Sequence, residues 1–268
     1  MHNIEDCIII IPVYKPLEKN DIIVIKQAVA MTPGMKKVFI MPDSFTIDKS
    51  FAVFSNFSIE RFENHFFVGK LGYNRLMLCL DFYKRFSNYK YMLIHQTDAY
   101  LFKPDLQYWC NKNYDYIGAP WLRPHKIKKA KIYLQAVDIF PWIFSSRLRN
   151  KVRHYNNVGN GGLSLRRIDT FIKILESDEA RPILNLYLEK QLSKRALYNE
   201  DVFWSIEGPQ LYEKFTKPVW REACRFSLEN HPSFAYDIMN KQLPFGCHAP
   251  LVHDPVFWRD HIPYMKTE

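Results

Sequence analysis

The chain has 268 residues, of which 47% are hydrophobic and 24% charged, and its formal net charge at pH 7 is +9. This length and apolar content are enough for a large core in one domain. No apolar run approaches the roughly 20 residues that a membrane-spanning helix needs, and the N-terminal run follows two acids where a signal peptide would be basic. We therefore expect a cytoplasmic protein. Its five cysteines are widely spaced without a CxxC pair, which favours reduced thiols over a disulfide framework or a zinc site.

The first part of the chain alternates between predicted strands and helices. The apolar runs that predict buried strands are 7–14, 38–41 and 57–62. Asn20 is expected to cap a helix that reaches about Met31, and apolar residues recur at near-helical spacing over 71–86. This alternation favours an α/β domain with a mostly parallel central sheet and helices on both faces.

The next apolar run, residues 91–102, predicts a buried strand that carries an acid, Asp98, at its tip. Asp98 interrupts that run, which then resumes as Ala-Tyr-Leu-Phe. A carboxylate just beyond the carboxyl end of a buried strand lies where open α/β sheets bind ligands. Asp98 is therefore a candidate for a ligand or metal site, and the alternative is that it only caps the following turn.

A basic and aromatic segment occupies residues 123–153. It contains nine lysine and arginine residues against one acid, Asp138, around an apolar centre that includes Trp142 and Phe144. Such segments suit an anionic membrane surface, where each cation near the leaflet contributes on the order of 1 kcal/mol. The alternatives are a solvated insertion whose aromatic residues pack on the body of the protein, and, with least weight, nucleic acid.

Three later motifs carry polar or flexible residues. Glycines 159, 161 and 162 allow close backbone approach, although their spacing is neither a P-loop nor a dinucleotide fingerprint. Asn199-Glu200-Asp201 opens an aromatic segment, where a helix cap and two dipole-complementing acids are the simpler interpretation. His248 lies in a tight turn, and with Asp98 it would make an open site for Mn²⁺ or Mg²⁺. His253 is a second candidate for that ligand.

In order along the chain, six segments resemble the GT-A class of nucleotide-sugar glycosyltransferases. Within that class, the segments resemble a bacterial family that acts in the synthesis of surface polysaccharides, either O-antigen or capsule. This family includes galactofuranosyltransferase-like enzymes. The segments span most of the chain and are 73–76, 96–100, 116–121, 159–166, 200–204 and 244–248. The family's DxD element falls on Gln96-Thr97-Asp98, so Gln replaces the first acid. That departure weakens the case for an obligatory metal, and Gln96 would instead hydrogen-bond the donor ribose.

The resemblance implies inverting transfer of a sugar from a UDP-sugar donor, galactose or galactofuranose, to a hydroxyl of a glycan or lipid-linked oligosaccharide. Asp201 would be the general base with Glu200 behind it, and Asp98 and His248 would bind Mn²⁺ or Mg²⁺. Lys70 or Arg166 would assist at the diphosphate. The implied donor-binding residues are Pro12, Val13, Tyr14, Asp43, Lys70, Asn74, Gln96, Thr97 and Asp98. The implied acceptor-binding residues are Trp121, Gly161, Gly162, Arg166 and Trp204.

The expected organisation is one GT-A-like domain, with residues 1–102 as the nucleotide-sugar half and 103–268 as the acceptor half. The segment 123–153 would hold the enzyme against the inner face of the plasma membrane, and no nucleic acid is expected as a partner. Two other functions stay open. One is a nucleotidyltransferase acting on sugar phosphates, against which the missing basic glycine-rich loop after the first strand counts. The other is a non-catalytic module that binds a glycan or an anionic polymer.

Overall fold

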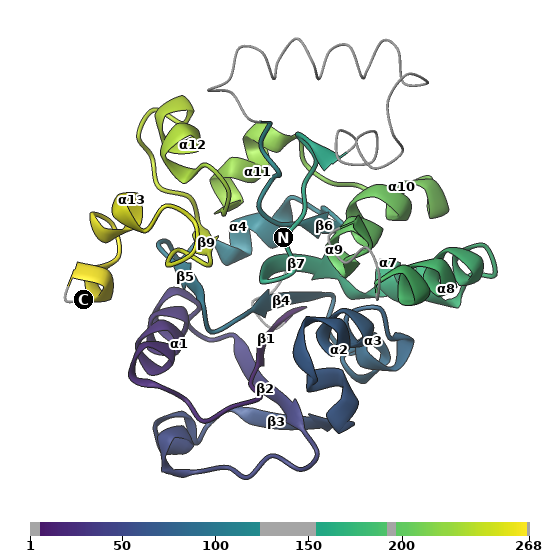
Figure 1. Ribbon diagram of the computed structural model, residues 1–268, viewed down its shortest axis with the longest axis horizontal. Helices are drawn as coiled ribbons and strands as arrows, with labels where there is room; N and C mark the ends of the chain where they lie inside the picture. Colours follow the sequence, from purple (N-terminus) through teal and green to yellow (C-terminus); the bar gives the residue numbers. More distant parts are fainter. Residues whose placement is uncertain (1–5, 124–153, 192–196, 267–268) are drawn as a thin grey trace.

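A six-stranded sheet forms the centre of the computed structural model, which describes residues 6–123, 154–191 and 197–266. The strand order is β3-β2-β1-β4-β7-β6, and Figure 1 shows the sheet between its helices. The strand bounds are β1 Cys7–Pro12, β2 Lys36–Pro42, β3 Ser58–Phe62, β4 Tyr91–His95, β6 Tyr116–Ile117 and β7 Leu163–Arg167.

The sheet is mostly parallel, as the alternating sequence pattern predicted. Strands β3, β2, β1 and β4 pair in parallel, whereas β7 is antiparallel to both β4 and β6. Leu163 at the start of β7 is paired with His95 at the end of β4. The loop that precedes β7 therefore reaches the sheet edge at which the parallel strands end.

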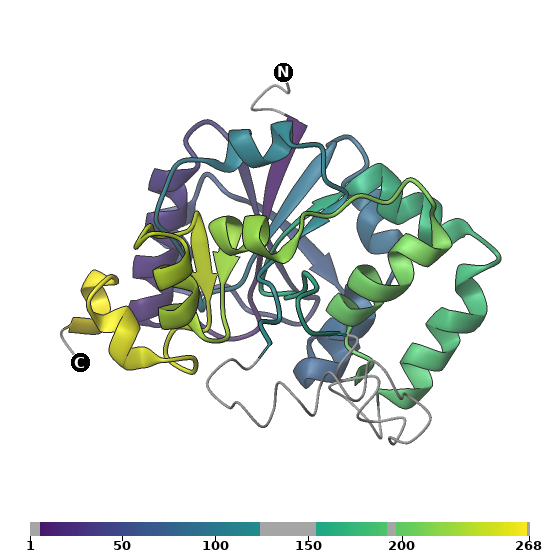
Figure 2. The ribbon, with the colours of Figure 1, turned by 90° about the horizontal axis from the view of Figure 1, so that it is seen from above.

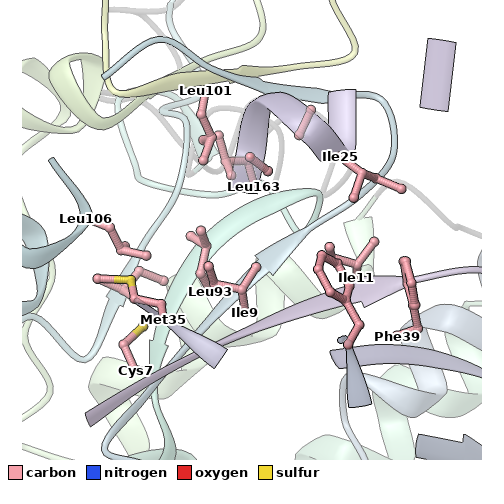
Figure 3. Close-up of a cluster of buried hydrophobic side chains, with 14 of the residues drawn as sticks. Cys7, Ile9, Ile11, Ile25, Met35, Phe39, Leu93, Leu101, Leu106 and Leu163 are labelled. Carbon is pink, nitrogen blue, oxygen red and sulfur yellow. The ribbon is translucent and has the colours of Figure 1, made fainter. Parts of the chain in front are cut away.

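The sheet separates two apolar cores, because alternate residues of each strand face opposite sides. Ile9 and Ile11 of β1 pack with residues of α1 (Lys19–Met31) and α4 (Leu106–Asn111), and Figure 3 shows this cluster. Ile8 and Ile10 pack on the other side. There they meet residues of the helices α2 (Gly69–Leu76), α3 (Leu80–Arg85), α7 (Ile168–Glu176) and α8 (Ala180–Lys190). Figure 2 shows helices on both sides of the sheet.

A second, smaller sheet has the order β5-β9-β8 and lies beside the main one. Its strands are β5 Ala99–Leu101, β9 Gly246–His248 and β8 Ser227–Leu228. The remaining helices are α9 Glu200–Val202, α10 Gly208–Leu211, α11 Trp220–Phe226, α12 Pro232–Ile238 and α13 Pro255–Arg259. A π-helical turn at Phe203–Glu207 joins α9 to α10, and 3₁₀ turns occupy Lys49–Phe54, Asn64–Phe67 and Pro263–Lys266.

The predicted strand that ends at Asp98 leaves the main sheet after His95, and Asp98 lies in the turn that follows. The apolar run beyond Asp98 forms β5 of the small sheet. The helix expected over 71–86 breaks between α2 and α3. At that break the Met77 carbonyl accepts hydrogen bonds from the Tyr83 hydroxyl and the Trp204 indole. Tertiary hydrogen bonds thus hold a turn where local periodicity predicted a continuous helix.

The start of α1 also differs from the prediction. The residue before the helix is Glu18, not Asn20, and the Asp21 carboxylate accepts a hydrogen bond of 2.9 Å from the Glu18 backbone N–H. An acid in the first helical turn suits the helix dipole as well as this hydrogen bond. Asn20 therefore lies inside the helix.

The predicted membrane-binding segment, 123–153, lies outside the described residues except for Arg123. Among the helices that the structure describes, none has the length and apolar content to cross a bilayer. All five cysteines are free thiols.

Candidate active site at the carboxyl ends of the strands

A cavity of about 510 Å³ lies at the carboxyl end of the parallel strands. Its wall includes most of the residues predicted for the donor, catalytic and metal sites and two of those predicted for the acceptor. These are Pro12, Tyr14, Lys70, Asn74, Gln96, Thr97, Asp98, Gly161, Gly162, Glu200, Asp201 and His248. Segments from both predicted halves of the chain, more than 200 residues apart, therefore meet around one cavity.

His248 is the centre of a polar cluster in this wall. Its Nε2 atom lies 3.2 Å from Asp98 Oδ1 and 3.1 Å from Gln96 Oε1. Its Nδ1 atom lies 2.9 Å from Glu229 Oε1 and 3.1 Å from Asn160 Nδ2. His253 lies farther out, with Nε2 3.8 Å from the same Glu229 oxygen. His248, rather than His253, is therefore the imidazole that faces Asp98.

The two neighbouring carboxylates control the charge of this imidazole. Burial alone would lower the pKa of His248, but its hydrogen bonds to Asp98 and Glu229 raise the pKa to about 10. The effect on Asp98 is reciprocal. Burial works to raise the pKa of that carboxyl, and the hydrogen bond and charge of His248 bring it below its usual value. Without a ligand, the cluster therefore holds an imidazolium between carboxylates at neutral pH.

The glycine-rich loop before β7 is folded around Asn160. Asn160 has a backbone φ of 85°, and its Oδ1 accepts hydrogen bonds from the N–H groups of Gly162 and Leu163 at 2.7 and 3.1 Å. A Cβ atom at Gly162 would overlap the His248 ring, and one at Gly161 would overlap the Glu200 carboxylate. These glycines are needed because functional side chains lie directly against the backbone.

Asp201 lies near the start of α9 and faces the cavity. Its Oδ2 accepts a hydrogen bond of 3.2 Å from the Asn160 backbone N–H, and its Oδ1 accepts one of 2.9 Å from the Val202 N–H. Burial raises the pKa of Asp201, and the nearby charge of Glu229 adds to the increase, while Lys70 opposes it. Asn160 contacts both Asp201 and His248, so it places the two groups on one wall.

The start of α9 is capped from another helix. Asn199 was expected to cap it, but its side chain makes no such bond. Instead, Asn74 Oδ1 of α2 accepts a 3.0 Å hydrogen bond from the Glu200 N–H, and Asn74 Nδ2 donates to Asn199 Oδ1 at 3.3 Å. Asn74 is thus buried and its side chain makes these two hydrogen bonds within the protein, although it also reaches the cavity wall.

Glu200 belongs to a buried ion pair. Its Oε1 lies 2.9 Å from Arg166 Nη2, and both side chains are almost fully buried. Arg166 also donates to Ser164 Oγ at 3.0 Å and to the Tyr83 hydroxyl at 2.9 Å. Burial raises the pKa of Glu200 to about 7, although the charge of Arg166 opposes the increase. This pair ties α9 to β7 and α3.

Five predicted site residues are not on the cavity wall: Val13, Asp43, Trp121, Arg166 and Trp204. Val13 is buried in the core, and Asp43 is exposed beyond the end of β2. Trp204 is fully buried and stacks on Phe171 with ring centroids 3.8 Å apart. Trp204 and Arg166 are therefore unavailable to a ligand in this structure, because packing and ion pairing already use their side chains. Trp121 packs against the loop backbone at Gly159.

Other wall residues were not assigned from the sequence. They include Lys15, Asp21, Tyr73, Asn160 and Glu229. Lys15 directly follows the predicted Tyr14, and Tyr73 precedes Asn74, so adjacency was a usable signal for these two. Glu229 carried none, because it follows a two-residue strand with no distinctive pattern.

The ligand set around His248 suits a divalent cation. Asp98 and Gln96 offer oxygen atoms and His248 offers a nitrogen, and Mn²⁺ accepts all three donor types. Within the residues that the structure describes, no group of three or more His, Cys, Asp or Glu side chains is arranged to hold a metal. Gln96 would therefore have to supply one oxygen, with the remaining ligands coming from diphosphate and water.

The fold of this protein was compared with solved structures. The structure is similar to an active-site mutant of LgtC, with a TM-score of 0.50 and 13% identity over 90% of this chain and 86% of that chain. It also matches a glycosyltransferase involved in the glycosylation of the major capsid of PBCV-1, with a TM-score of 0.46 and 9% identity over 98% of this chain and 100% of that chain. The similarity to the LgtC mutant confirms the GT-A-like α/β fold expected from the sequence.

At the level of sequence, no curated protein matches the chain. A family match covers more than half of the chain, residues 56–248, and it includes the loop after β4, the glycine-rich loop, α9 and His248. The chain therefore belongs to the family described as "Protein of unknown function (DUF5672)".

Proposed function

We propose that this protein is a glycosyltransferase that moves a sugar from a nucleoside diphosphate donor to a hydroxyl group of a glycan acceptor. The observation that carries the proposal is the meeting of Gln96, Asp98 and His248 beside Asp201 on one cavity wall. That wall lies beyond the carboxyl ends of parallel strands, where open α/β sheets bind nucleotides. The GT-A-like fold supports the same conclusion, although fold alone does not define an activity.

Asp201 has the properties of the base that the reaction needs. Burial raises its pKa, and its two backbone hydrogen bonds hold the carboxylate in place at the cavity wall. A base with a raised pKa is better matched to accepting a hydroxyl proton near neutral pH, and general-base catalysis as a whole contributes about 10²- to 10⁴-fold in rate. Glu200 would support this geometry through its ion pair with Arg166 rather than by contact with the acceptor.

The leaving diphosphate needs positive charge as its bond to the sugar breaks. A Mn²⁺ or Mg²⁺ ion held by Asp98, His248 and Gln96 would supply that charge. Lys70 is exposed on the same wall and would contact the phosphate oxygens directly. Arg166, which the sequence suggested for contact with the diphosphate, instead forms an ion pair with Glu200.

The finer parts of the proposal rest on the family resemblance. They are inversion at the anomeric carbon, UDP-galactose or UDP-galactofuranose as donor, and a glycan or lipid-linked oligosaccharide of surface polysaccharide synthesis as acceptor. Residues 1–102 would bind the nucleotide-sugar and 103–268 the acceptor. The segment 123–153 would hold the enzyme at the inner face of the plasma membrane, and its charge composition supports that role.

Calorimetric titration of UDP, with and without Mn²⁺, tests the donor site. We expect binding that Mn²⁺ strengthens, and we expect Asp98→Ala to lose the strengthening because it removes the carboxylate beside Nε2 of His248. Asp81→Ala is the matched control, since it removes an exposed acid in α3 that is not on the cavity wall. No UDP binding to the wild-type protein, with or without Mn²⁺, would sink the proposal.

A transfer assay then tests the base. Asp201→Asn should retain UDP binding and lose transfer to an acceptor by about 10²-fold or more, because the amide cannot take the hydroxyl proton. Full transfer by Asp201→Asn would remove this carboxylate from the mechanism. Release of pyrophosphate from a nucleoside triphosphate would instead identify a nucleotidyltransferase.

A further inference from the structure

The small sheet places three polar side chains in a row at one end. Asp98 immediately precedes β5, His248 ends β9 and Glu229 directly follows β8. Ala99 pairs with His248, and Leu228 pairs with Cys247, so the neighbouring strands bring the two acids to opposite sides of the imidazole. Figure 1 shows β5 and β9 beside the main sheet. The row is thus a product of strand register, with Glu229 contributed by a strand of only two residues.

The two ring nitrogens of His248 have different partners. Nε2 faces the cavity-wall oxygens of Gln96 and Asp98 at 3.1 and 3.2 Å. Nδ1 faces Glu229 Oε1 at 2.9 Å, and Asn160 Nδ2 lies 3.1 Å from the same nitrogen. An ionised carboxylate can only accept hydrogen bonds, so both nitrogens of the imidazolium donate, Nδ1–H to Glu229 and Nε2–H toward Asp98. A cation bound at Asp98 and Gln96 would replace the proton of Nε2 and leave Nδ1–H donating to Glu229.

Neighbouring residues also restrict the position of the His248 ring. Gly162 lies so close to the ring that a Cβ atom there would overlap Nε2, Cδ2 and Cε1. Glu229 itself is mostly buried, with 17% of its side chain exposed, and His253 Nε2 lies 3.8 Å from the same oxygen that bonds His248. The ring therefore has a packed face and an anchored Nδ1, and Nε2 is directed at Asp98 and Gln96.

We propose that Glu229 is a positioning residue that fixes the ring orientation and the Nδ1–H tautomer of His248, so that Nε2 binds a divalent cation together with Asp98 and Gln96. This inference rests on the cation site of the proposed function. Carboxylates that bond the second nitrogen of a metal-binding histidine commonly contribute 10- to 100-fold to metal affinity. Glu229 contacts neither the cation nor the reacting atoms in this arrangement.

The test measures Mn²⁺ affinity from the electron paramagnetic resonance signal of the free ion, with and without UDP. The proteins are wild type, Glu229→Leu and Glu229→Gln. We expect Glu229→Leu to weaken Mn²⁺ binding by about 10- to 100-fold. Glu229→Gln should retain most of the affinity, because its carbonyl oxygen can still accept from Nδ1–H. Glu222→Gln is the control, since that partly buried carboxylate bonds Tyr114 at 2.8 Å and is not on the cavity wall.

Thermal unfolding of each variant separates positioning from folding. A loss of Mn²⁺ affinity in Glu229→Leu with an unchanged unfolding temperature, and its recovery in Glu229→Gln, is the expected result. Wild-type affinity in Glu229→Leu would overturn the inference, as would an equal loss in Glu229→Gln or in the Glu222→Gln control. Absence of Mn²⁺ binding by the wild type would also overturn it. The proposed donor site is judged separately by UDP binding alone.

Discussion

Two clusters of opposite charges, one on the cavity wall and one largely behind it, differ in exposure. In the first, His248 lies between Asp98 and Glu229, and the Asp98 side chain is 54% exposed. In the second, Arg166 and Glu200 are 0% and 2% exposed, with Tyr83 and Ser164 completing the arginine's hydrogen bonds. The open cluster can exchange partners with a ligand, whereas the sealed cluster has its main partners inside the protein. This difference suits the first cluster to the binding role proposed for it and the second to holding α9 in place.

The largest expected effect comes from breaking the sealed cluster. Arg166→Met should lower the free energy of unfolding by about 3–5 kcal/mol, because it leaves the Glu200 carboxylate buried without its cation. Urea unfolding measures the change. The double variant Arg166→Met/Glu200→Gln should recover part of the loss, since it removes the stranded charge. A loss below about 1 kcal/mol in the single variant would mean that the pair is not sealed.

Added side-chain volume beside the imidazole of the open cluster should destabilise the protein. Gly162→Ala places a Cβ against the His248 ring, and we expect it to lower the free energy of unfolding by about 1–3 kcal/mol. Because the overlap is with the ring, the same substitution in a His248→Ala background should cost much less. Equal costs in both backgrounds, measured by urea unfolding, would place the strain elsewhere in the loop.

The stability of the sealed cluster should also depend on pH. The pKa of Glu200 is about 7 in the folded protein against an ordinary value of 4.5, so the folded state binds the proton more tightly than the unfolded state. The resulting stability is fully present below the ordinary pKa and is lost as pH rises through about 7. The stability of the wild type relative to Glu200→Gln should therefore fall between about pH 5 and pH 8. A pH-independent difference between them would contradict this.

The sequence predicted most of the main sheet because its signals are local. Continuous apolar runs indicate buried strands, and Asp98 stands out as an acid within such a run. Pairing His248 with Asp98 was also possible, because both residue types suit a cation. These predictions depend on residue type and neighbours along the chain, which are visible before folding.

Four predictions or omissions show where tertiary contacts, rather than local sequence, decide the outcome. Arg166 and Trp204 have side chains that suit a sugar or phosphate, but Glu200 pairs with the first and Phe171 stacks on the second. Asn199 has the right type for a helix cap, yet Asn74 from a distant helix takes that role. Glu229 was missed because only the register of β8 with β9 brings it to His248.

The chain on either side of the segment 124–153 is held together by backbone hydrogen bonds. Trp121 N–H donates to the Asn157 carbonyl at 2.9 Å, Asn156 N–H donates to the Trp121 carbonyl at 2.7 Å, and Pro120 is bridged to Val158. The chain thus departs and returns at adjoining points, directly before the loop that carries Asn160. Because loop length changes closure entropy only slowly, we expect that a short turn joining Arg123 to His154 would leave the cavity unchanged. The sequence between these two residues could then vary without altering the cavity wall.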